Sequence, residues 1–95
     1  MYVRMVIGEV AGKNQLKQLR SIYRNQVEPQ IFKEPGLATT GIMAEENGQT
    51  VVFLTMWDNR DNCLRYYCSD AYRQFVSKTE HLLKKDFSVK VFQME

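Results

Sequence analysis

The sequence predicts an α+β fold in which four strands and two helices follow one another in the order β-α-β-β-α-β. Apolar, β-rich stretches occupy residues 2–10, 37–45, 49–57 and 87–94. In the two long stretches between them, apolar residues recur every three or four positions, as in an amphipathic helix. Right-handed crossovers would then give a four-stranded antiparallel sheet with both helices on one face, the ferredoxin-like arrangement.

Length and composition fit a single domain over residues 1–95. The formal charge is +2, from 13 basic and 11 acidic residues mixed along the chain, so we expect neither nucleic acid nor a membrane as partner. Cys63 and Cys68 are spaced neither as CxxC nor as a same-face helical pair. We therefore interpret them as reduced thiols, and we expect a cytoplasmic location.

The first half of the chain contains the first predicted helix and a hairpin. The helix begins near Lys13, and Pro29 should end or kink it near Val27–Glu28. Its apolar stripe consists of Leu16, Leu19, Tyr23 and Val27. Asn47–Gly48 predicts a type I′ turn between the second and third strands, because both central residues of that turn need positive φ.

The second half of the chain contains a strand ending at Trp57 and a second, interrupted helix. Asp58 or Asn59 is expected to cap this helix, and Asp70 to cap it again after a break near Ser69–Asp70. The apolar stripe then continues through Tyr72, Phe75, Val76, Thr79, Leu82 and Leu83. A last strand over 87–94 completes the order.

The third strand is apolar on both faces. Val51, Phe53 and Trp57 lie on one parity, and Val52, Leu54 and Met56 lie on the other. Two helices on one side of the sheet cover only one of these faces. We therefore expect a homodimer in which the sheet of a second copy covers the other face.

Few residues have the pattern of a known catalytic or metal site. His81 is the only histidine, so a histidine pair for metal is absent, and no metal site is expected. His81 is either a helix-end surface residue or a general base or haem ligand. Trp57 is either a core residue or a pocket wall. A phenol has an ordinary pKa of about 10, so a tyrosine is a hydrogen-bond donor at neutral pH and not a ready base.

The residues EPG before the second strand and the run TMWDNRDNCLRYYCSDAY resemble the antibiotic biosynthesis monooxygenase domain family. The resemblance covers nearly the whole chain. It implies a small dimeric ferredoxin-like protein, a dimeric α+β barrel, with a pocket between helices and sheet. Some members oxygenate polyphenols or quinols without metal or flavin, because the deprotonated substrate itself reduces oxygen. On this resemblance no cofactor is expected.

The resemblance also implies a set of site residues. Tyr66 is the expected catalytic residue, through a hydrogen bond to the substrate oxygen. The expected substrate-binding residues are Trp57, Tyr72, Val76, Tyr23 and Tyr67. Quinol-oxidising relatives typically have a histidine at the position of Tyr66. Haem-degrading relatives have a tryptophan there, a histidine at the position of Val76 and an asparagine on the first strand, and this chain lacks all three.

The sequence thus predicts a cofactor-independent monooxygenase for a small aromatic or quinol-type substrate. The alternative is a non-catalytic small-molecule-binding or stress-response protein on the same dimeric scaffold. Fold alone does not choose between them, because function depends on the site.

Overall fold

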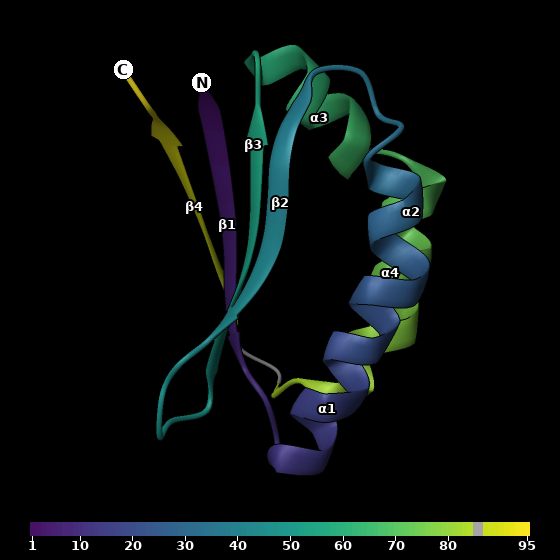
Figure 1. The fold of residues 1–95 in the computed structure, drawn as a ribbon, viewed down its shortest axis with the longest axis vertical. Helices are drawn as coiled ribbons and strands as arrows, with labels where there is room; N and C mark the ends of the chain where they lie inside the picture. The colour runs from purple at the N-terminus through teal and green to yellow at the C-terminus, as the bar shows by residue number, and fades with distance from the viewer. Residues whose placement is uncertain (85–86) are drawn as a thin grey trace.

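The four strands form one antiparallel sheet, as predicted. The computed structural model describes residues 1–84 and 87–95. The strands are β1 (Tyr2–Glu9), β2 (Leu37–Ala44), β3 (Thr50–Trp57) and β4 (Ser88–Gln93), and their order across the sheet is β2-β3-β1-β4. The helices lie on one side of this sheet (Figure 1). The ferredoxin-like prediction is confirmed.

The helical segments form two groups, one before β2 and one after β3. The first group is continuous and the second is broken once, between α3 and α4. Their bounds are α1 (Lys13–Ile22), the π-helical turn η1 (Tyr23–Val27), α2 (Glu28–Ile31), α3 (Arg60–Tyr67), α4 (Asp70–Thr79) and the 3₁₀ turn η2 (Glu80–Leu82). α1, α2 and α4 run alongside the sheet, whereas α3 lies near one end of β2 and β3 (Figure 1).

The register of the sheet determines which side chains face the helices. Trp57 on β3 lies opposite Tyr2 on β1, and Phe53 lies opposite Val6. Residues directly opposite each other in an antiparallel pair point to the same face. On β3, every second residue from Val51 to Trp57 is buried, and the residues between them are only partly buried. The buried parity faces the helices, and we call this side the inner face of the sheet.

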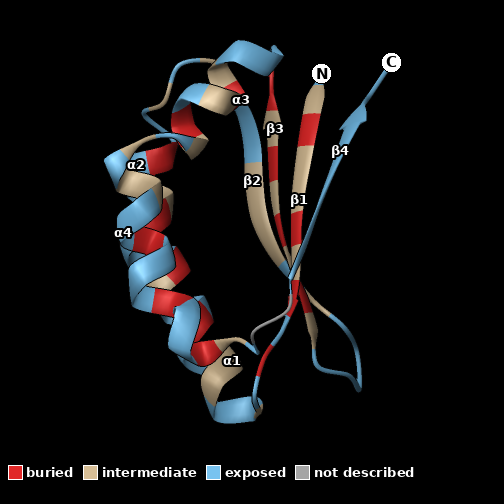
Figure 2. Cartoon of the chain, turned by 180° about the vertical axis from the view of Figure 1, so that it is seen from behind, coloured by how far each residue is buried: buried red, intermediate tan, exposed pale blue. Residues whose placement is uncertain are grey.

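The hydrophobic core fills the contact between this inner face and the helices. Its largest fully buried side chains are Trp57, Leu19, Ile31, Val51 and Cys63. Buried residues line the helix sides that face the sheet, and exposed residues lie on the opposite sides (Figure 2). Burial of each large apolar side chain stabilises the fold by roughly 1.5–3 kcal/mol.

Pro29 does not end the first helical group, contrary to the sequence prediction. The helix passes through the π-helical turn η1 and continues to Ile31, with Pro29 in the first turn of α2. Proline lacks the N–H that an interior helical residue donates, so it is tolerated best where a new helical segment begins. The wider turn before it lets the helical group continue.

The hairpin between β2 and β3 is confirmed, but its turn differs from the predicted type. Gly48 N donates to Glu45 O, which places Glu46 and Asn47 at the two central positions. Asn47 has a φ of 58°, and it is the one non-glycine residue with positive φ in the described ranges. The predicted type I′ turn centred on Asn47–Gly48 would need positive φ at both residues. Asn47 has positive φ and Gly48 does not, so the turn is of another type.

The caps of the second helical group agree with the sequence in one case and differ in the other. Asn59 caps α3, because its side-chain oxygen accepts a hydrogen bond from Asn62 N at 2.9 Å. At the break, Ser69 rather than Asp70 is the cap, since the Ser69 hydroxyl accepts from Tyr72 N. Asp70 is the first residue of α4, where its charge is favourable at the helix N-terminus.

A search of the described residues finds no helix with both the length and the apolar character that crossing a membrane requires.

Gly36 directly precedes β2, lies beside the start of α3, and has a φ of 81°. A Cβ atom at this position would overlap the side chains of Asp58 and Asn62. We therefore predict that Gly36→Ala lowers the free energy of unfolding by about 1–3 kcal/mol.

Urea denaturation followed by circular dichroism would measure this change at one protein concentration. Gly8→Ala is the matched control, because an added Cβ there makes only ordinary van der Waals contacts, the nearest at 3.7 Å. Equal stability of the two variants would contradict the steric argument.

Candidate functional site

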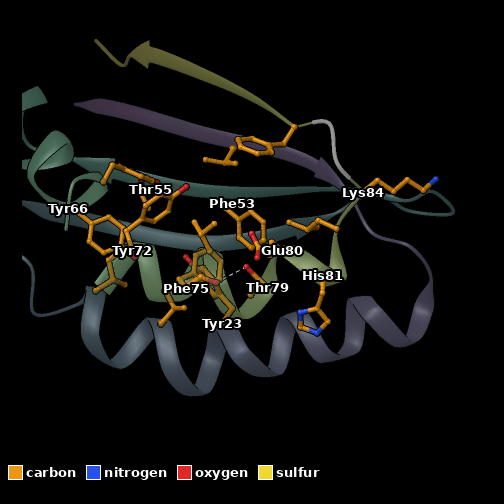
Figure 3. Close-up of a pocket in the computed structure, with 17 residues that line it drawn as sticks. Tyr23, Phe53, Thr55, Tyr66, Tyr72, Phe75, Thr79, Glu80, His81 and Lys84 are labelled. Carbon is orange, nitrogen blue, oxygen red and sulfur yellow. Dashed lines mark hydrogen bonds between the residues drawn. The ribbon is translucent and has the colours of Figure 1, made fainter. Parts of the chain in front are cut away.

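A cavity of about 510 Å³ lies between the inner face of the sheet and the helices. Its walls come from β1, β3, η1, α2, α3, α4 and the segment that follows α4. Figure 3 shows two different ends. We call the end lined by Thr55, Tyr66, Tyr67 and Tyr72 the aromatic end, and the end lined by Glu80, His81 and Lys84 the polar end. The rings of Tyr23, Phe53 and Phe75 line the middle.

Three tyrosine rings pack edge to face at the aromatic end. The ring centroids of Tyr67 and Tyr72 are 4.6 Å apart, those of Tyr66 and Tyr67 5.1 Å, and those of Tyr66 and Tyr72 5.7 Å. Each such pair stabilises the fold by about 0.5–1.5 kcal/mol beyond the effect of the area it buries. α3 supplies two of the rings and α4 supplies the third. The break between these helices therefore brings all three to one place.

Burial keeps the phenols of Tyr66 and Tyr67 protonated. Burial raises the pKa of Tyr66 well above its ordinary value, and the neighbouring phenols of Tyr67, Tyr23 and Tyr72 raise it further. Burial likewise raises the pKa of Tyr67, although its hydrogen bond with Thr55 opposes the shift. The Tyr67 hydroxyl lies 2.9 Å from Thr55 Oγ1. At neutral pH these groups are hydrogen-bond donors and not bases.

Tyr23 is held by a short chain of hydrogen bonds from the helix to the sheet. Thr40 Oγ1 donates to Leu54 O at 2.9 Å, which uses the only proton of that hydroxyl. The Tyr23 hydroxyl is hydrogen-bonded to Thr40 Oγ1, so Tyr23 must be the donor. Its lone pairs remain available as acceptors. Burial raises the pKa of Tyr23. The hydrogen bond to Thr40 lowers this pKa, and the negative charge of Glu28 raises it.

Arg4 lies behind the aromatic end. The carbon at the centre of its guanidinium is 3.9 Å from the centroid of the Tyr67 ring, a cation–π contact. Arg4 Nε is buried and has no hydrogen-bond partner in the structure. Burial raises the pKa of Tyr72. Arg4 opposes this shift, through its positive charge and as a hydrogen-bond donor.

The polar end is open to solvent. Glu80, His81 and Lys84 are exposed. Lys84 Nζ lies 3.4 Å from Glu9 Oε2 and 3.0 Å from Gln49 Oε1, so it bridges the end of β1 to the β2–β3 hairpin. His81 extends from the helix away from the aromatic end (Figure 3). This position agrees with the helix-end interpretation of His81.

Five of the six residues that the sequence singled out line the cavity: Tyr23, Tyr66, Tyr67, Tyr72 and Val76. Trp57, expected as a pocket wall, differs. It is fully buried, and the cavity lining described above does not include it. Its ring lies against that of Tyr66, with centroids 5.7 Å apart. Trp57 therefore supports Tyr66 from behind, because α3 begins three residues later and covers it.

Sequence reasoning missed Thr55, Thr40 and Arg4. Thr55 lies on the same parity of β3 as Phe53 and Trp57, which the sequence shows, but because the strand is apolar on both parities only the structure shows that this parity faces inward. Thr40 and Arg4 gave no comparable signal. Both side chains depend on contacts with residues far away in sequence, Tyr23 and Tyr67 respectively.

A second hollow, of about 280 Å³, lies between the two helical groups. It is more polar than the cavity and is lined by residues that include Asn25, Gln26, Gln74 and Lys78. Tyr66, Val27 and Phe75 line both spaces. The wall between them is therefore one side chain thick at Tyr66.

Within the described ranges no group of three or more His, Cys, Asp or Glu side chains could hold a metal ion. Both cysteines are free there, with Cys63 buried and Cys68 exposed. Burial raises the pKa of the Cys63 thiol, and the charge of Arg4 opposes this shift.

The raised pKa of Tyr66 predicts a loss of stability at alkaline pH. Above about pH 10 the unfolded chain loses the Tyr66 proton while the folded chain keeps it, so the free energy of unfolding falls as pH rises. One such group contributes a slope of about −1.4 kcal/mol per pH unit. In Tyr66→Phe the slope above pH 10 should be shallower by about this amount. Urea denaturation at several alkaline pH values would measure it, and an unchanged slope would refute the assignment.

The fold is that of several solved monooxygenases. A monooxygenase from the gene ActVA-Orf6 of Streptomyces coelicolor, solved in complex with nanaomycin D, superposes with a TM-score of 0.87 at 16% identity, over 99% of this chain and 87% of that one. SnoaB, a cofactor-independent oxygenase from Streptomyces nogalater, superposes with a TM-score of 0.81 at 13% identity, over 98% of this chain and 91% of that one.

A third structure, an antibiotic biosynthesis monooxygenase, gives a TM-score of 0.81 at 14% identity, over 100% of this chain and 99% of that one. No family sequence model matches the chain, and no curated protein sequence matches it. At these identities the likeness is one of fold. The chain has the ferredoxin-like α+β fold of the antibiotic biosynthesis monooxygenase structures.

Proposed function

We propose that the protein is a cofactor-independent monooxygenase that acts on a small aromatic or quinol-type molecule bound in the cavity. The aromatic end is the observation that carries this proposal. It presents phenol hydroxyls at the apolar end of a space of about 510 Å³, opposite the polar end. Small-molecule sites typically combine such apolar walls with a few placed polar groups. The fold shared with cofactor-independent oxygenases supports the same class of chemistry.

In the proposed reaction, a ring C–H of the substrate becomes a ring C–O. The substrate loses a hydroxyl proton to solvent, and the anion passes one electron to O₂. The substrate radical and superoxide combine into a ring peroxide anion, which takes up a proton from solvent to become the hydroperoxide and then loses water to leave the quinone. One oxygen atom enters the product and the other leaves as water, so the substrate itself is the reductant.

The protein would supply position and environment for these steps. Tyr66 donates a hydrogen bond to the substrate oxygen, which stabilises the negative charge that forms there. Tyr72, Tyr67 and Val76 hold the ring plane, and Tyr23 closes the helix side of the space. Trp57 keeps the Tyr66 ring in place. Exclusion of water protects the reactive intermediates.

Oxygen uptake with a panel of hydroquinones and naphthols would test the proposal. We expect uptake that depends on protein concentration and is unaffected by catalase, because monooxygenation produces water. Autoxidation produces hydrogen peroxide, and catalase would return part of that oxygen. Tyr66→Phe should lower kcat/KM by about 10- to 100-fold, the effect of one lost hydrogen bond to a charged oxygen.

Tyr2→Phe is the matched control, since Tyr2 lies on β1 outside the cavity lining, and it should keep full activity. Equal activity of wild type and Tyr66→Phe would remove the role assigned to that hydroxyl. Tight ligand binding without any oxygen uptake would favour the alternative, a non-catalytic small-molecule-binding protein.

We further propose that the protein is a homodimer through the outer face of the sheet. The helices leave this face uncovered, and its β3 residues Val52, Leu54 and Met56 are only partly buried. Their partners on β1 are Val3, Met5 and Ile7, and those on the flanking strands include Met43 and Phe92. Continuous apolar surfaces of this kind are typical of protein interfaces.

Sedimentation or gel filtration should therefore give a mass near twice the chain mass of 11.2 kDa. Leu54→Lys places a charge at the centre of the outer face and should produce monomers, because an unpaired charge is costly to bury in an interface. Gln18→Lys, on the exposed side of α1, is the control and should remain dimeric. A monomeric wild type at micromolar concentration would refute the proposal.

A further inference from the structure

Among the residues that the structure describes, the guanidinium of Arg4 has no acidic partner. The ion pairs among residues 1–84 and 87–95 join Arg73 to Asp70 and Lys84 to Glu9, and both are exposed. Arg4, by contrast, lies on the inner parity of β1, directly opposite Thr55 of the cavity lining. Its Nε atom is buried without a hydrogen-bond partner.

The contacts of Arg4 place its charge next to the aromatic end. Its guanidinium carbon lies 3.9 Å from the centroid of the Tyr67 ring, and the Tyr67 and Tyr72 ring centroids are 4.6 Å apart. Arg4 is outside the cavity lining, whereas Tyr67, Tyr72 and Thr55 are part of it. The positive charge therefore lies behind one layer of side chains that a ligand would touch.

Packing alone does not explain this arrangement. Taking a charged group out of water costs several kcal/mol when no opposite charge compensates it. A cation–π contact returns only about 0.5–2 kcal/mol. A partly desolvated cation without a carboxylate, beside a cavity, is more typical of a site that receives an anion.

We propose that the aromatic end is a binding subsite for a negatively charged oxygen, a phenolate or carboxylate on an aromatic ring, and that Arg4 is the positioning residue that supplies its charge compensation. The hydroxyls of Tyr72 and Tyr66 lie nearer to the ligand and donate to the same oxygen. This inference rests on one part of the proposed function, the binding of an aromatic ligand in the cavity. It holds for a binding protein as well as for an enzyme.

Arg4 then determines which protonation state of a phenol is bound. An apolar cavity without a charge favours the neutral phenol, because desolvation penalises the anion. A guanidinium a few ångströms away reverses this preference, since the interaction of two unit charges is strong where water is excluded. Arg4 acts in the same direction on the protein's own groups: burial raises the pKa values of Tyr67 and Tyr72, and Arg4 opposes both shifts without reversing them.

The probe 4-nitrophenol tests this inference directly, because its phenolate absorbs visible light and its neutral form does not. We expect wild-type protein to lower the pKa of the bound probe below that of the free probe. In Arg4→Met the pKa of the bound probe should lie above that of the free probe, a change of tenfold or more in its ionisation constant. Arg4→Lys keeps the charge and should retain part of the effect.

The probe 4-nitroanisole is the neutral control, since it has the same ring and cannot ionise. Its affinity should change by less than about twofold in Arg4→Met, because an uncharged ligand gains little from a nearby cation. Arg20→Met removes an exposed arginine from α1 and should behave as wild type with both probes. If Arg4→Met does not fold, wild type and Arg4→Lys still test the inference through the direction of the pKa change.

Three results would overturn the inference: a raised pKa of 4-nitrophenol bound to wild type, equal ionisation in wild type and Arg4→Met, or equal loss of affinity for both probes in Arg4→Met. Failure of both probes to bind wild type would refute the aromatic cavity of the proposed function and the subsite with it. An Arg4-dependent ionised probe without oxygen uptake would support the subsite and refute only the oxygenase proposal.

Discussion

β3 is hydrogen-bonded on both sides, to β1 and to β2, and this double pairing determines which of its side chains face the helices. Phe53 and Thr55 reach the cavity because the register puts them on the inner parity. A slip of one residue would turn both to the outer face and bring Leu54 inward. The aromatic end, the core and the outer apolar face therefore all depend on one alignment of three strands.

The cavity is a departure from ordinary packing. Protein interiors are packed as densely as organic crystals, and a space of 510 Å³ in a chain of 11.2 kDa forgoes many dispersion contacts. The surrounding rings offset part of this loss by contacting one another. Phe53 and Phe75 meet edge to face with centroids 5.3 Å apart, and Tyr23 lies within about 6 Å of both. The walls are therefore packed against one another although the space between them is open.

The sequence predicted the fold well because the fold depends on periodicity. The β-rich stretches and the helical stripes were visible residue by residue, and they correctly indicated the four strands and the two helical groups, but β3 is apolar on both parities and did not show which face the helices cover. Tyr66 and Tyr72 were expected in the site only because of the family resemblance, and periodicity did not bring them together. Contacts that cross between distant segments were not predictable in this way.

Three residues illustrate that limit. Trp57 has the correct parity, yet it lies behind Tyr66, because α3 begins soon after it and covers it. Arg4 gave no signal, since β1 is largely apolar on both parities and its partner ring is more than 60 residues away. Pro29 was expected to stop a helix, and only the three-dimensional path shows that a π-helical turn lets the chain continue.

That turn, η1, has a consequence for how such a cavity changes over time. A π-helical turn is equivalent to one extra residue in an α-helix. Because the wider turn absorbs that residue locally, the helical segments on either side keep nearly the register they would have in an α-helix one residue shorter. Tyr23 and Ile31 both face the cavity in this arrangement. The chain could therefore lose one residue at this turn during evolution while both residues still face the cavity and every strand of the sheet stays untouched.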